Sequence, residues 1–83
     1  MVNEQLLLRF LGDDLSIDTA GITPAEPLFS SGIVDSFALI TLMTFLETQC
    51  GFRIGPMEVT LDNFDSIERI LRFAERKTRE ADA

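Results

Sequence analysis

The sequence predicts a small all-α domain, a four-helix bundle of three main helices plus one short helix, with a long first loop. Three observations support this prediction. The 83 residues allow one domain, residues 1–83, and leave no room for a second one. Apolar residues recur at helical spacing in three segments, and glycines and prolines separate these segments. The apolar fraction of 46% is ordinary for a folded protein, so we expect the chain to be ordered.

The first helix is expected from about Glu4 to Leu11. Asn3 can cap its start, and Gly12 can end it, as glycine commonly does after a helix. Its buried side would consist of Leu6, Leu7, Phe10 and Leu11. The connection over residues 13–35 is long for a compact domain, but its apolar residues can anchor it across the helices. Within it, residues 30–32 are expected to form a turn that brings the following residues to the surface.

The second helix is expected from about Ser36 to Gln49, with Gly51 closing it. Asp35 is a suitable N-cap, because its carboxylate can accept hydrogen bonds from the first free N–H groups of the helix. One apolar face would pack on the rest of the bundle, and it consists of Leu39, Leu42, Met43, Leu46 and Cys50.

The last third of the chain is predicted to hold a loop over residues 53–60 and one short helical turn over residues 61–64. Asp65 and Glu68 have the spacing of a capping box, which predicts a final helix from about Ser66 to Thr78. The tail over residues 79–83 is expected to fray. The inward side of this helix would consist of Ile67, Ile70, Leu71 and Ala74. Its outer surface would carry Arg69, Arg72, Arg76 and Lys77.

The composition argues against several classes of function. A net charge of −7 disfavours nucleic acid as a partner, since phosphate binding needs clustered Lys and Arg. The chain has no histidine, which excludes a Ser–His triad, and only one cysteine besides, which excludes the usual zinc sites, so we expect neither an enzyme nor a metal site. With no membrane-spanning stretch and no signal peptide, the chain is expected to be a cytoplasmic monomer. Its single cysteine, Cys50, is expected to pack in the core of the protein.

Charge is unevenly distributed along the sequence. Between Phe10 and Phe52 there are acidic residues and no basic one, whereas most of the basic residues follow Phe52. The acidic half could face a basic partner, or it could be an ordinary solvated surface, and the sequence leaves both interpretations open.

Ser36 is the best candidate for a functional residue. It would lie on the first turn of the second helix, where free N–H groups and the helix dipole favour a phosphate ester. Phe37 and Ile40, together with Thr41 and Thr44, lie off the packing face of that helix. Exposed apolar side chains beside the serine indicate a docking surface. The alternative for Phe37 is partial burial under the long loop.

The segment Gly32-Ile33-Val34-Asp35-Ser36-Phe37 resembles the G-x-x-D-S-[LMF] attachment motif of acyl and peptidyl carrier proteins. The resemblance covers nearly the whole chain. It includes Leu28-Phe29 before the motif, the apolar helix after it, and Asn63-Phe64-Asp65-Ser66-Ile67, which is similar to the entry to the family's last helix. The resemblance implies that Ser36 receives a 4′-phosphopantetheine arm from coenzyme A through a separate phosphopantetheinyl transferase, with Asp35 helping to position the serine.

The resemblance also implies a stand-alone, non-catalytic carrier that holds an acyl or aminoacyl group as a thioester on the arm. Its partners would be a loading ligase and downstream biosynthetic enzymes. Fatty-acid carriers have many acids on the second helix, whereas this helix has only Glu47. The docking face would therefore be uncharged, which favours a specialised, nonribosomal-peptide- or polyketide-like pathway; it would consist of Phe37, Ala38, Ile40, Thr41 and Thr44. The alternative is a small helical adaptor that binds a partner through Phe37 and Ile40 without covalent modification.

Overall fold

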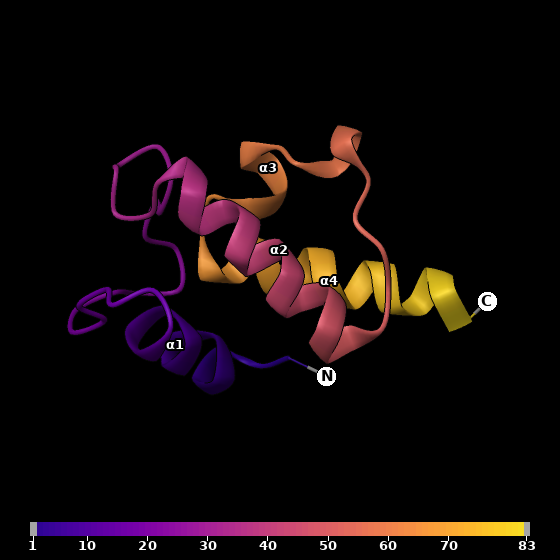
Figure 1. Cartoon of the computed structure of the whole chain (residues 1–83), viewed down its shortest axis with the longest axis horizontal. Helices are drawn as coiled ribbons and strands as arrows, with labels where there is room; N and C mark the ends of the chain where they lie inside the picture. The colour runs from indigo at the N-terminus through magenta and orange to yellow at the C-terminus, as the bar shows by residue number, and fades with distance from the viewer. Residues whose placement is uncertain (1, 83) are drawn as a thin grey trace.

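The computed structural model describes residues 2–82, and within that range the chain is helical with no strand. The all-α prediction is therefore confirmed, including the short helix and the long first loop (Figure 1). The elements in chain order are α1 (Glu4–Asp13), α2 (Ser36–Cys50), the 3-10 turn η1 (Pro56–Glu58), α3 (Leu61–Phe64) and α4 (Ile67–Asp82).

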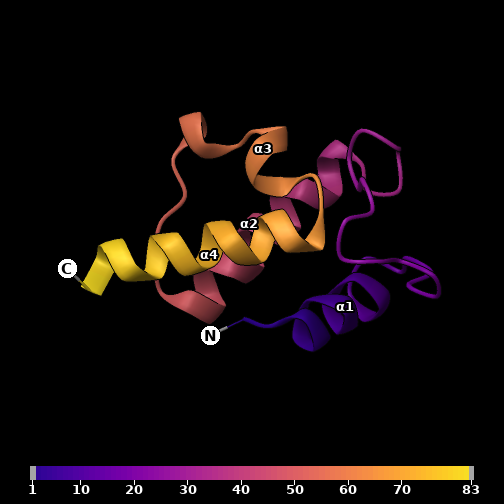
Figure 2. The ribbon, with the colours of Figure 1, turned by 180° about the vertical axis from the view of Figure 1, so that it is seen from behind.

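Helix α4 is the central packing element of the fold. It packs against α1, α2 and α3, and the views from the two sides show α2 and α4 crossing between α1 and α3 (Figures 1 and 2). Phe73 on α4 lies in the core with its ring centroid 5.1 Å from that of Phe64 and 6.1 Å from that of Phe52. The inward side of α4 was predicted without Phe73, and the predicted Leu71 is only half-buried.

Helix α1 begins where the sequence predicts and ends later. The Asn3 side chain accepts a hydrogen bond from the Leu6 N–H at 2.8 Å, which confirms the N-cap. The predicted end at Gly12 is wrong, because the helix continues to Asp13 and the Asp14 N–H still bonds to the Phe10 carbonyl at 2.9 Å. The chain turns away beyond that point, at Ser16, whose φ is 56°. Leu6, predicted to be buried, is half-buried.

The connection between α1 and α2 packs on the helices, as predicted. Leu28 and Val34 are buried in the core. Backbone hydrogen bonds also tie the connection to distant parts of the chain: the Leu28 N–H donates to the Asp65 carbonyl at 2.7 Å, and the Glu68 N–H donates to the Pro24 carbonyl at 2.9 Å. The loop before Ser36 is thus fixed to the start of α4.

The start and the end of α4 both differ from the prediction. The helix begins at Ile67, and the Ser66 hydroxyl accepts from the Arg69 N–H at 3.1 Å, so Ser66 and not Asp65 supplies the cap. The helix also runs past its predicted end at Thr78 and continues to Asp82; Ala83 lies outside the described residues. An i,i+4 ion pair between Arg79 and Glu75 supports the last turns.

The two ends of the described chain lie away from the start of α2. The N-terminus lies near the end of α2, and the C-terminal end of α4 projects beyond the bundle (Figure 1). Helix α2 itself runs one residue further than predicted, to Cys50, and Gly51 closes it with a φ of 77°, as expected for a left-handed cap.

Candidate functional site

Ser36 is the first residue of α2, and its side chain is exposed. Asp35 precedes it in an extended conformation, and its Oδ1 atom accepts a hydrogen bond from the Ala38 N–H at 2.8 Å. The N-cap prediction for Asp35 is therefore confirmed. Because an α-helix leaves its first N–H groups without partners inside the helix, the Ser36 hydroxyl lies at a site that favours negative charge.

A tight turn before Asp35 brings the serine to the surface. The Gly32 N–H donates to the Phe29 carbonyl at 3.1 Å, and Gly32 has a φ of 85°, which a side chain would strain. The Val34 N–H donates to the Leu28 carbonyl at 2.9 Å, and both of these side chains are buried. The turn is closed at its base and anchored in the core, so it has little freedom to move the serine.

A pocket of about 230 Å³ opens beside Ser36. Its walls come from the loop before the serine, from α2, and from the segment around α3, and they are mainly apolar. Leu61 and Phe64 of α3 line this pocket together with the serine. The sequence did not reveal the contribution from α3, because it depends on how the chain after α2 folds back. The lining residues are Phe29, Ser36, Leu39, Val59, Thr60, Leu61 and Phe64.

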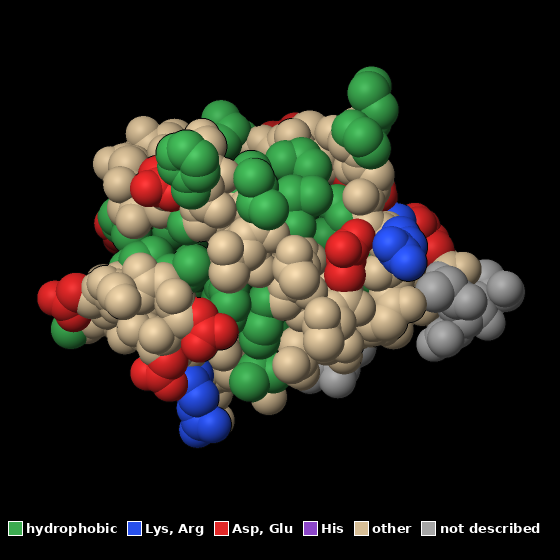
Figure 3. Space-filling model, in the orientation of Figure 1, with side chains coloured by type: hydrophobic (Ala, Val, Ile, Leu, Met, Phe, Trp, Pro, Cys, Tyr) green, Lys and Arg blue, Asp and Glu red, His purple; other side chains and the backbone are tan. Residues whose placement is uncertain are grey.

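Large apolar side chains are exposed around this pocket. Phe37 is 83% exposed and Ile40 is 64% exposed, so the alternative of partial burial for Phe37 is wrong. Two further exposed residues were missed by the sequence, namely Met57 on η1 at 91% and Leu61 on α3 at 55%. Figure 3 shows hydrophobic side chains at the surface over the start of α2 and toward α3 and η1. We call Phe37, Ile40, Met57 and Leu61 the exposed apolar surface.

The other predicted docking residues divide between this surface and a second groove. Ala38 is half-buried against the core, so it adds little to an exposed face. Thr41 and Thr44 are exposed, and with Ile40 they line one side of a groove of about 420 Å³ between α1 and α2. The Thr44 hydroxyl donates back to the Ile40 carbonyl at 3.2 Å.

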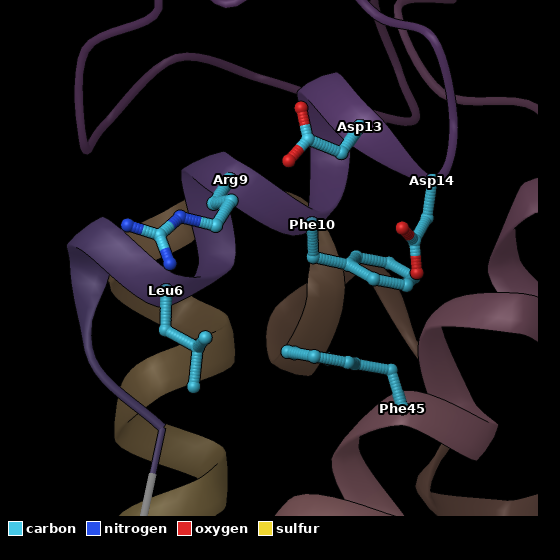
Figure 4. A pocket seen from close by; sticks show the side chains of 6 residues that line it. All are labelled: Leu6, Arg9, Phe10, Asp13, Asp14 and Phe45. Carbon is cyan, nitrogen blue, oxygen red and sulfur yellow. The ribbon is translucent and has the colours of Figure 1, made fainter.

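The floor of that groove is an aromatic pair. The rings of Phe10 and Phe45 stack with their centroids 4.1 Å apart and their planes 18° from parallel. Figure 4 shows the two rings facing each other in the adjoining pocket of about 130 Å³, with Arg9, Asp13 and Asp14 placed around it. This pair joins α1 to α2, which accounts for the half-buried position of Phe45.

Two charged groups close to α2, Glu47 and the Glu58–Lys77 pair, are engaged in contacts away from the exposed apolar surface. Glu47, the single acid of α2, is half-buried, and its Oε2 atom accepts from the Ile54 N–H at 2.8 Å. The Lys77 side chain is only 17% exposed and lies 3.0 Å from the Glu58 carboxylate, so its predicted place on the outer surface is wrong. The hydrogen bond from the Gly55 N–H, followed by that from Lys77, lowers the pKa of Glu58 from its ordinary value of 4.5.

The arrangement fits a phosphate ester carrying an organic group. The exposed hydroxyl offers the oxygen, the helix start favours the charge, and the neighbouring apolar pocket can contact an organic chain. Residues 2–82 hold no cluster of three or more His, Cys, Asp or Glu side chains suited to a metal ion. Within the same residues no helix combines the length and apolarity needed to cross a membrane.

Comparison with known proteins agrees with this geometry. The family model described as "Phosphopantetheine attachment site" matches residues 5–74. The chain is also similar to the probable acyl carrier protein PigG of Serratia sp. (strain ATCC 39006), with 28% identity over 76 residues, which cover 92% of this chain and 87% of the relative. Proteins of this family are carriers rather than enzymes, and they bear a covalently attached 4′-phosphopantetheine group. The match spans both the loop and the helices that form the pocket, and the chain belongs to the family of phosphopantetheine-binding carrier proteins.

Proposed function

We propose that Ser36 is the attachment residue and that the chain presents a thioester-bound acyl or aminoacyl group to partner enzymes. In the attachment reaction, a transferase would guide the Ser36 Oγ atom to the phosphorus that bears the pantetheine in coenzyme A. The new bond is the serine–phosphate ester, and the pyrophosphate linkage breaks with adenosine 3′,5′-bisphosphate as the leaving group. The hydroxyl proton passes to a base of the transferase, because residues 2–82 contain no histidine and place no free base beside the serine.

The surroundings of the five serines carry the proposal. The Ser30 and Ser31 hydroxyls donate to the Asp65 carboxylate and the Pro27 carbonyl respectively. Ser66 is buried and caps α4. Ser16 is exposed but lies in the connection after α1, away from any helix start. Ser36 alone combines exposure, a helix start and an adjoining apolar pocket.

The residues around Ser36 have separate roles in this proposal. Asp35 fixes the first turn of α2 and thereby the direction of the serine. The exposed apolar surface is where the transferase, a loading ligase and later enzymes dock. Since the arm is tethered, its cargo reaches each partner at a high effective concentration even when docking is weak.

We further propose a specialised pathway of the nonribosomal-peptide or polyketide kind. The support is the uncharged exposed face of α2, on which Phe37 and Ile40 are exposed, while the one acid of α2 is turned inward to Ile54. Recognition would then depend on apolar contact more than on ion pairs. A cytoplasmic location fits the supply of coenzyme A and the unpaired Cys50.

Intact mass spectrometry tests the attachment. The purified chain is incubated with coenzyme A, Mg²⁺ and a broad-range phosphopantetheinyl transferase. We expect one phosphopantetheinyl group on the wild-type chain, none on Ser36→Ala, and full addition on the matched control Ser16→Ala. An unmodified wild-type chain, under conditions that modify a known carrier, would reject the proposal. The adaptor alternative predicts instead that Ser36→Ala leaves function intact. Intact mass from the native host would then identify the cargo.

A further inference from the structure

The carboxylate of Asp65 is bonded to the loop that precedes Ser36, although the two segments are far apart in the sequence. Its Oδ1 atom accepts from the Phe29 N–H at 2.8 Å and from the Ser30 N–H at 2.9 Å. Its Oδ2 atom accepts from the Ser30 hydroxyl at 2.7 Å. The Asp65 carbonyl accepts a further bond from the Leu28 N–H at 2.7 Å. One residue therefore holds three consecutive loop residues by four hydrogen bonds.

These bonds are not needed to start α4. Asp65 stands where the sequence predicts a helix cap, but Ser66 provides that cap through its bond to the Arg69 N–H. The Asp65 carboxylate is thus available to the loop. Hydrogen bonds to an ionised acceptor are stronger than neutral ones, so this contact can order a surface turn. The same bonds, led by the one from the Ser30 N–H, keep the pKa of Asp65 below its ordinary value of 3.8.

The held loop leads directly to the attachment residue. Phe29 begins the turn that Gly32 closes, and the bond from the Val34 N–H to the Leu28 carbonyl completes the base of that turn. Phe29 also lines the pocket beside Ser36 from the loop side, and Leu61 and Phe64 line it from the α3 side. Asp65 directly follows Phe64, so its bonds to the loop fix the distance between the two walls of this pocket.

We propose that Asp65 is a positioning residue that holds the turn before Ser36, and the pocket wall formed by Phe29, in the arrangement that the transferase binds. The proposal rests on the proposed attachment at Ser36. Without these bonds, the turn would adopt the arrangement that the transferase binds for only part of the time. A partner that must reorder the turn on binding then shows a weaker apparent affinity, while the chemical step after binding is unchanged.

The test is the steady-state kinetics of arm transfer, with the carrier as the varied substrate. We expect Asp65→Ala to raise KM about tenfold with kcat within about twofold of wild type, since the competent fraction scales the apparent affinity. Ser30→Ala, which removes one of the bonds, should raise KM about threefold. The matched control is Asp62→Asn, which neutralises an exposed carboxylate on the neighbouring α3. Its KM should remain that of wild type.

A second control separates positioning from stability. Ile70→Val removes one methyl group from the core of α4 and lowers the free energy of unfolding without touching the turn. Hydrogen exchange should be faster at the Phe29 and Ser30 amides in Asp65→Asn, but unchanged there in Ile70→Val. If Asp65→Ala does not fold, Asp65→Asn and Ser30→Ala carry the kinetic test.

The outcomes distinguish the two proposals. The positioning role is supported if KM rises in the Asp65 and Ser30 variants but not in the two control variants, with every variant shown to be folded. An unchanged KM in those variants, or an equal rise in Ile70→Val, overturns it and leaves attachment at Ser36 intact. If the wild-type chain is not modified at all, the proposed attachment fails, and the positioning role fails with it.

Discussion

Helices α2 and α4 are similar in length but distribute their apolar residues differently. On α4, the apolar residues lie inward and most of the charged ones outward, with the half-buried Lys77 as an exception. Phe73 and Ile70 are buried, whereas Arg72 and Glu75 are exposed. On α2, apolar residues occur on both sides; Leu42 and Leu46 are fully buried, whereas Phe37 and Ile40 are exposed. An amphipathic helix is what packing against a single core requires.

The difference assigns separate roles to the two helices. The exposed apolar residues of α2 contribute little to the core, so folding alone does not account for them. They lie beside Ser36, at the end of the helix that partners would approach in the proposed function. On the proposed function, α4 provides stability, and the first half of α2 would provide contact with partners. This division predicts that substitutions on the two helices affect different measurements.

The largest expected effect is on stability, from the core side of α4. Phe73→Ala should lower the free energy of unfolding by about 3–5 kcal/mol, because it removes a buried ring between two other aromatic rings. Phe37→Ala on α2 should change it by less than about 0.5 kcal/mol, as expected for an exposed residue. Urea unfolding at 25 °C measures both values. Equal losses in the two variants would contradict the division of roles.

A second effect concerns docking. Phe37→Asp should raise the KM of the transferase for the carrier about tenfold, since loss of an apolar contact at an interface commonly costs more than 1 kcal/mol. The stability of this variant should equal or exceed that of wild type, because an acid near a helix start is favourable. Gln49→Asp, at the other end of α2, is the matched control and should leave KM unchanged. A KM that depends steeply on salt would contradict apolar recognition.

The smallest expected effect is on the pH dependence of the free energy of unfolding, and it involves the pair that Glu58 forms with Lys77 of α4. The folded-state pKa of Glu58 is lowered by the Gly55 N–H and by Lys77 of α4. Its contribution to stability is therefore complete above its ordinary pKa of 4.5 and is lost as the pH falls through the folded-state value. Urea unfolding between pH 6 and pH 3 should show a shallower fall for Glu58→Gln than for wild type. A parallel fall in the two proteins would contradict this role of the Glu58–Lys77 pair.

Local sequence rules predicted the features of the fold that local contacts determine. Asn3 and Asp35 cap their helices with bonds three residues along the chain, and Gly51 closes α2 with a left-handed φ. The exposure of Ser36 was predicted from its place on the first turn of the helix, and that of Phe37 from its position off the packing face that the helical spacing defines. These features need no knowledge of the rest of the chain.

The remaining features depend on contacts between distant segments. Asp65 and Ser66 are both good caps, and the loop more than thirty residues earlier decides between them by binding the Asp65 carboxylate. Phe73 lies three residues after Ile70, so helical spacing already places it on the inward side of α4 and the prediction omitted it; only its ring partners, Phe64 and Phe52, depend on distant segments. The sequence also did not place Leu61 in the pocket beside Ser36, because that position depends on how the chain after α2 folds back. Periodicity within one helix contains no information about such partners.

The position of the chain ends has a practical and biological consequence. Both lie away from the first turn of α2, so a tether at either end would leave the serine facing open solvent (Figure 1). The protein could be immobilised on a resin, labelled with a dye, or fused to a neighbouring enzyme without shielding the serine that is proposed to carry the cargo.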